Sequence, residues 1–125
     1  MNKLLIITLL SLMLGTQAQA ICLRTTTPYS GIVPANSQIV AYGPFSAIKD
    51  ASCLSIAIES RVEATSGRYT PALTLEVLNG SNWQRVLNST SGNITTTIDP
   101  GTYRIIHINN SAASVAYTGS TALKR

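Results

Sequence analysis

The stretch TIDPGTYRIIHI, residues 97–108, predicts a tight turn followed at once by a strand. Asp99-Pro100-Gly101 forms the turn, because these residue types dominate turns. Side chains of an extended chain alternate between two faces. Here the two sets are Tyr103, Ile105 and His107 on one face, and Arg104, Ile106 and Ile108 on the other. Apolar residues occur on both faces, as in a central strand, so we expect His107, the only histidine, to be structural.

Short β-rich runs of this kind recur at intervals of about ten residues, and turn residues divide them. The expected strands span residues 22–27, 37–42, 53–63, 73–77, 83–87, 94–98, 102–108 and 114–118. Seven or eight strands at this spacing favour an all-β fold, an antiparallel two-sheet sandwich. We expect one such domain over residues 21–125.

Three of these predictions concern where strands stop and which face they bury. Pro28 is expected to end the first strand, and Gly43-Pro44 the second. In the strand over 53–63, Leu54, Ile56 and Ile58 alternate with polar or small residues, so they are expected on one buried face. Asn79-Gly80-Ser81-Asn82 is a strong hairpin signal, because Asn and Gly tolerate positive φ.

The later part of the chain resembles a known family. The segments YTPALTLEVLNGSNWQRVLN, TTTIDPGTYRIIHI and SVAYTGS, within about residues 69–120, are similar to the bacterial pre-peptidase C-terminal domain. The resemblance implies a jelly-roll-like accessory module of secreted proteins that has no catalysis of its own. Two features depart from that family: the module stands alone here, and the acidic residues of its calcium sites have no clear counterparts.

The first twenty residues predict an export signal. Lys3 gives the positive start, Leu4 to Leu14 the apolar stretch, and Ala18-Gln19-Ala20 a small-residue cleavage site. A retained membrane anchor is the alternative, but the apolar stretch is shorter than the roughly 20 residues that span a bilayer. We expect cleavage after Ala20, no membrane span in the remaining chain, and export to the periplasm or the extracellular space of a bacterium.

Composition narrows the choice of partners. The chain is 45% hydrophobic and 11% charged, below the roughly 25% charged residues usual in globular domains. Polar uncharged residues must therefore cover the surface, which suits an extracellular protein and favours self-association into a homo-oligomer. The net charge of +4 includes Lys3, and the other cationic residues are scattered. Since a nucleic-acid binder shows a basic stripe, we expect no nucleic-acid partner.

Cys22 and Cys53 are the only cysteines. In an oxidising compartment such a pair predicts one disulfide. It would hold the start of the exported chain against the strand that begins near Cys53. The alternative, a catalytic thiol, needs a free cysteine beside a base.

No combination of residues predicts catalysis, a metal or a cofactor. A catalytic His107 would need a nucleophile and an orienting carboxylate, and no serine has a nucleophile-elbow context. One histidine and two paired cysteines leave zinc without its usual ligands. The five carboxylates are dispersed along the chain, which predicts no calcium site. Asp99 is expected to accept hydrogen bonds within its own turn.

Trp83 is the strongest candidate for binding. It follows the predicted hairpin tip, where its ring could meet a sugar or a protein partner, and Asn79, Ser81 and Asn82 offer polar groups beside it. The alternative is that Trp83 folds inward and plugs one end of the sandwich.

These features predict an exported, small, non-catalytic binding or adhesion module of a bacterial envelope or the extracellular space, with a glycan or an envelope protein as its partner. The runner-up is a structural subunit that self-assembles at the cell surface as a filament or layer, through exposed strand edges. A third class is a secreted enzyme or enzyme inhibitor.

Overall fold

A computed structural model describes residues 22–51, 53–65 and 69–125. The predicted export signal over residues 1–20, with its cleavage site, lies outside these residues. The described chain forms eight β-strands and no helix, so it contains no helix that could cross a membrane. The strands form two antiparallel sheets, which confirms the predicted all-β sandwich.

The strands follow one another along the chain with short connections. They are β1 (Arg24–Val33), β2 (Ser37–Ala47), β3 (Ile56–Ala64), β4 (Ala72–Asn79), β5 (Asn82–Ser89), β6 (Asn93–Ile98), β7 (Gly101–Asn109) and β8 (Val115–Lys124).

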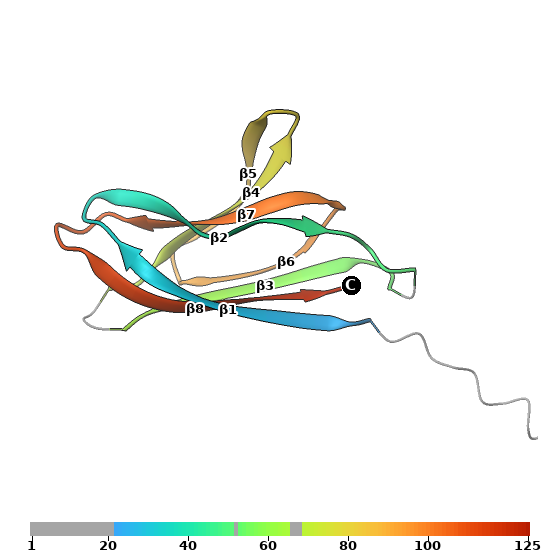
Figure 1. Ribbon diagram of the computed structural model, residues 1–125, viewed down its shortest axis with the longest axis horizontal. Helices are drawn as coiled ribbons and strands as arrows, with labels where there is room; N and C mark the ends of the chain where they lie inside the picture. The colour runs from blue at the N-terminus through green and yellow to red at the C-terminus, as the bar shows by residue number, and fades with distance from the viewer. Residues whose placement is uncertain (1–21, 52, 66–68) are drawn as a thin grey trace, which may run out of the picture.

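Successive strands pass from one sheet to the other, except that β4 and β5 form a hairpin within one sheet. One sheet has the order β1-β8-β3-β6 and the other the order β2-β7-β4-β5. Figure 1 shows β1, β3 and β8 in one layer, with β2 and β7 in the other. Eight strands in this order make a jelly roll of two Greek keys. β7, the strand of the opening motif, lies between β2 and β4 and is central as predicted.

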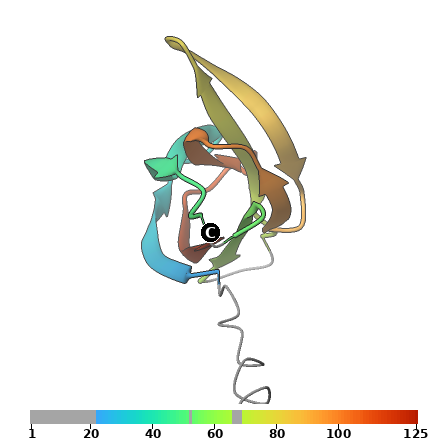
Figure 2. The ribbon, with the colours of Figure 1, turned by 90° about the vertical axis from the view of Figure 1, so that its right-hand side faces the viewer.

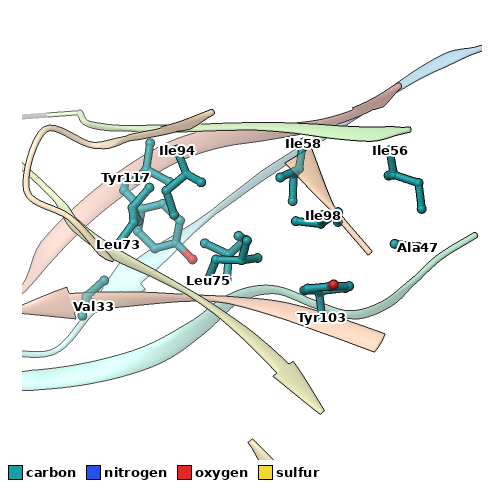
Figure 3. Packing of buried hydrophobic residues seen from close by; sticks show 12 residues of the cluster. Val33, Ala47, Ile56, Ile58, Leu73, Leu75, Ile94, Ile98, Tyr103 and Tyr117 are labelled. Atoms are coloured by element: carbon teal, nitrogen blue, oxygen red, sulfur yellow. The ribbon is translucent and has the colours of Figure 1, made fainter. Parts of the chain in front are cut away.

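The core fills the space between the layers, because each strand turns its alternate apolar residues inward. β3 buries Ile56, Ile58 and Val62, and Leu75 and Ile105 face them from the other sheet. Figure 3 shows Ile56, Ile58 and Leu75 in this space together with the rings of Tyr103 and Tyr117.

Leu54 is a correction to the predicted core. Its side chain is 99% exposed, because β3 begins at Ile56 and the chain before it has not entered the alternating strand. Ile56 and Ile58 are buried as expected.

Two predicted strand ends are wrong as well. β1 continues through Pro28, which pairs with Ser120; as an edge strand, β1 tolerates a residue without an N–H. β2 continues through Gly43-Pro44, since register shifts between Val40 and Phe45 absorb the irregularity against β7. β8 is also longer than predicted and runs to Lys124.

The disulfide prediction is confirmed. Cys22 and Cys53 are bonded, with Cα atoms 5.0 Å apart and a sequence separation of 31. Next to the disulfide, the residue before β1 pairs with the residue after β8: Leu23 and Arg125 exchange two backbone hydrogen bonds of 2.7 and 2.9 Å. The bond is typical of proteins that fold in an oxidising compartment.

A small polar cluster lies within the first sheet. The hydroxyls of Tyr29, Ser60 and Thr121 are mutually hydrogen bonded at 3.0–3.1 Å. Ser60 and Thr121 are almost fully buried. Because each hydroxyl has two partners, burying these groups carries little penalty.

Candidate binding site

The β4–β5 hairpin is the part of the molecule that projects from the sandwich. Figures 1 and 2 show its tip standing clear of both layers. The turn is the predicted one: Asn79 pairs with Asn82, and Gly80 adopts a φ of 65° with no other atom near its missing Cβ. Asn79, Ser81 and Asn82 are all exposed at the tip.

Trp83 lies on the outer face of the second sheet, next to this tip. It pairs across the hairpin with Leu78, on the face opposite the buried Leu75. The guanidinium of Arg104 lies over the indole ring, with Cζ 4.2 Å from the ring centroid. Trp83 is half-buried under this contact. Its ring therefore neither enters the core nor presents two open faces to solvent.

Arg104 is held over the ring by a carboxylate. Its Nε donates to Oε1 of Glu76 at 2.7 Å, and the two side chains are 25% and 20% exposed. Glu76 on β4 stands opposite Arg104 on β7, so the register of two strands places the pair. A cation over an indole adds about 0.5–2 kcal/mol of attraction, more as water is excluded. Together the ion pair and the ring form a fixed surface on the hairpin's base.

This surface has the chemistry of a binding site for polar or anionic groups. Arg85 stands on the other side of Glu76, across β4 and β5, and is exposed. Two guanidinium groups thus flank one carboxylate, which leaves the surface net positive. Guanidinium groups donate paired hydrogen bonds to carboxylates and carbonyls. An indole beside them offers apolar area at low entropic cost.

The structure brings the four predicted candidates, Asn79, Ser81, Asn82 and Trp83, together on one hairpin. The sequence analysis did not connect Arg104 and Glu76 to them. The alternation of residues 103–108 places Arg104 on the face away from the buried Tyr103 and Ile105, so its position on the outer face could be predicted from the sequence. The pairing of β7 with β4, however, arises from a fold-level contact between segments 28 residues apart.

His107 lies in the interior, as the structural interpretation requires. Its side chain is 0% exposed, between the stacked ring of Tyr69 at 6.0 Å and the edge-on ring of Tyr117 at 4.7 Å. Neither ring nitrogen has a hydrogen-bond partner, and burial lowers the pKa of His107 below its usual value. In this position the ring is shielded from solvent.

Metal-ligating side chains do not gather anywhere within residues 22–51, 53–65 and 69–125. No group of three His, Cys, Asp or Glu side chains lies together there. Asp99 lies in the turn before β7, and its backbone carbonyl accepts a hydrogen bond of 2.7 Å from the Tyr103 hydroxyl.

The described residues form an eight-strand jelly roll with a projecting hairpin, and a solved structure has a similar overall fold. The Yersinia pseudotuberculosis-derived mitogen aligns with a TM-score of 0.58 and 13% identity, over 79% of this chain and 86% of that protein. At this identity the similarity establishes the fold alone.

Two further solved structures align more loosely. A subunit from the Bacillus endospore appendages, described as disulfide-linked pili, gives a TM-score of 0.41 at 14% identity, over 88% of this chain and 95% of that one. FlhE gives 0.35 at 12% identity, over 81% and 95%. TM-scores below 0.5 do not establish a common fold. No protein-family model and no curated protein sequence matches the chain.

Proposed function

We propose that the chain is an exported, non-catalytic binding or adhesion module whose partner docks on the β4–β5 hairpin. The observation that carries this proposal is the Arg104–Trp83 contact on the outer face of that hairpin. Tryptophan and arginine are the residues that most often dominate the energy of protein interfaces. The disulfide supports an exported protein, because such bonds persist in oxidising compartments.

The geometry favours an envelope or cell-surface protein over a glycan as the partner. A sugar stacks on an open aromatic face, and Arg104 already covers one face of the indole. A protein partner can instead supply carboxylates or carbonyls to the guanidinium groups of Arg104 and Arg85. The resemblance of residues 69–120 to the pre-peptidase C-terminal domain, which implies an accessory module, stays a prediction beside this proposal.

A binding assay on envelope fractions and a glycan array tests the proposal. We expect Trp83→Ala and Arg104→Ala each to weaken binding about tenfold or more. The matched control is Ile32→Ala, a side chain that is 65% exposed at the far end of β1. Absence of binding to every fraction, or binding that survives Trp83→Ala unchanged, would contradict the proposal.

Self-assembly through a strand edge remains the second candidate, and β5 is the edge that bears on it. β5 pairs only with β4 and is exposed along most of its length. However, the register shift beside Glu76 makes Val86 a bulge, and Arg85 precedes it. Bulges and charges are the features by which proteins keep edges from pairing. Sizing at high concentration decides: a strictly monomeric species rules out assembly.

A further inference from the structure

The end of the sandwich that carries the disulfide is distinct from the hairpin. We call it the disulfide end; it consists of the described residues of 22–24, 47–55 and 124–125. Figure 2 looks onto this end, with the hairpin tip at the upper edge of the view. Three chain segments meet there: the start of β1, the connection from β2 to β3, and the last residues of β8.

Apolar side chains stand in solvent at the disulfide end. Leu54 is 99% exposed, and Leu23 and Ile48 are each 62% exposed. Such side chains are normally withdrawn from water when a neighbouring element can cover them. Leu23 and Leu54 follow the two bonded cysteines, Cys22 and Cys53, and Ile48 lies on the same β2–β3 connection as Leu54. Exposed apolar side chains gathered at one end of a domain mark a surface that contacts something else.

Cationic side chains surround these apolar groups. Lys49 and Lys124 line an open cavity of about 620 Å³ beside the disulfide, and Leu54 lies on the same wall. Arg24 and Arg125 belong to the same end, and Arg24 is paired with Glu59 at 3.2 Å. Asp50 is a second carboxylate in this region. Four cationic groups thus face two carboxylates, so the disulfide end has a positive rim.

We infer that the disulfide end docks on an anionic phospholipid surface. Leucine and isoleucine side chains enter the boundary between headgroups and acyl chains, while lysines bind the lipid phosphates. Protein interfaces favour aromatic anchors. Because the described residues of this end include no aromatic side chain, a lipid surface fits them better than a protein partner does. A second copy of the chain would bring two positive rims together, which disfavours self-association here.

Vesicle flotation with the chain from residue 21 onward tests the inference. The probes are vesicles of phosphatidylcholine alone and of phosphatidylcholine mixed with phosphatidylglycerol. We expect binding only to the mixed vesicles, with weaker binding at high salt because ions screen the charges. Leu54→Ser should weaken binding about tenfold, and Lys124→Gln about fivefold. Residues 22–125 contain the whole sandwich and its disulfide.

The matched controls change similar side chains elsewhere. Ile32→Ser removes an apolar group that is 65% exposed at the opposite end of β1, and Arg61→Gln removes an exposed charge from the middle of β3. Both variants should bind vesicles like the unmodified chain. Equal binding to both vesicle types, or equal loss in Ile32→Ser and Leu54→Ser, would overturn the inference.

Other occupants are separate outcomes of the same experiment. A concentration-dependent dimer that Leu54→Ser abolishes would replace the lipid with a second copy. Binding to polyglutamate that depends on Lys124 but not on Leu54 would replace it with an acidic polypeptide. Trp83→Ala should leave vesicle binding unchanged, so failure of the hairpin proposal and failure of this one can be told apart.

Discussion

His107 is an ionisable side chain that is fully buried between the two sheets. It pairs across strands with Ile39 and Leu73, and the rings of Tyr69 and Tyr117 enclose it. Tyr69 directs its hydroxyl to the carbonyl of Ile108 instead. Among the described residues, no hydrogen-bond partner of the imidazole offsets the desolvation that disfavours its protonated form.

We expect His107→Leu to stabilise the protein by about 1 kcal/mol near neutral pH, because an unsatisfied buried polar group costs about 1–3 kcal/mol. The pH dependence should change too. Since the pKa of the folded-state ring is lowered, the unfolded chain takes up the proton first as pH falls. Stability is therefore full above about pH 6.5 and falls below it by up to about 1.4 kcal/mol per pH unit.

Urea unfolding at pH about 7.5 and about 5 measures this difference. The carboxylates contribute equally to both proteins, and the chain has no other histidine, so the comparison isolates residue 107. If the two proteins lose the same stability on acidification, the unpartnered imidazole is not the cause.

At the scale of elements, β8 lies between β1 and β3 in one sheet, and Gly119 on β8 is closely surrounded by both neighbours. A Cβ at Gly119 would lie 2.5 Å from the ring of Tyr29 and 2.9 Å from the carbonyl oxygen of Arg61. We expect Gly119→Ala to destabilise the protein by about 1–3 kcal/mol, because the strand must shift. The control is Gly101→Ala, whose nearest contact is 3.4 Å away; it should cost less than about 0.5 kcal/mol. Equal unfolding midpoints for both variants would contradict this account.

The disulfide joins β1 to the entry of β3, two strands of one sheet with β8 between them. Reducing it should lower the free energy of unfolding by about 3–4 kcal/mol, because the reduced unfolded chain regains the freedom of a long loop. Urea unfolding with and without reductant measures the change. A Cys22→Ala/Cys53→Ala variant should not respond to reductant, and unchanged stability of the natural chain on reduction would sink the prediction.

Strand existence could be predicted from the sequence, whereas strand ends could not. Alternation identified the strands containing Ile56, Leu75 and Ile105, since each buries one face. Pro28 and Gly43-Pro44 misled because a proline ends a strand only where its missing N–H is needed, and both lie on edge strands. Whether a strand is an edge is a property of the sheet order, which local pattern does not contain.

In the molecule as a whole, we expect the backbone amides to be better protected from solvent exchange at the centre of a sheet than in the hairpin. β7 is flanked on both sides and largely buried, whereas β5 has one neighbour and is mostly exposed. Hydrogen exchange followed by mass spectrometry should show faster exchange over residues 82–89 than over 101–109. Similar protection of the two segments would mean that β5 is covered in solution, as an assembled subunit would require.

At the molecular scale, only part of the candidate site could be predicted from the sequence. Trp83 and its polar neighbours could be predicted because they are consecutive at a turn. Arg104 and Glu76 join them only when β7 pairs with β4. The pairing of β4 with β7 thus completes the surface, and the spacing of residues in the sequence does not predict which strands pair.

The hydrogen bonds between Leu23 and Arg125 have a practical consequence. A short peptide link could connect these positions, and the chain could then be reopened at Gly80-Ser81, where the hairpin turns in solvent. Circular permutation is tolerated at such exposed tips when the positions to be linked lie close together. The permuted protein would keep the jelly roll, with β4 still paired to β7, and would place its new chain ends at the surface that we assign to the partner.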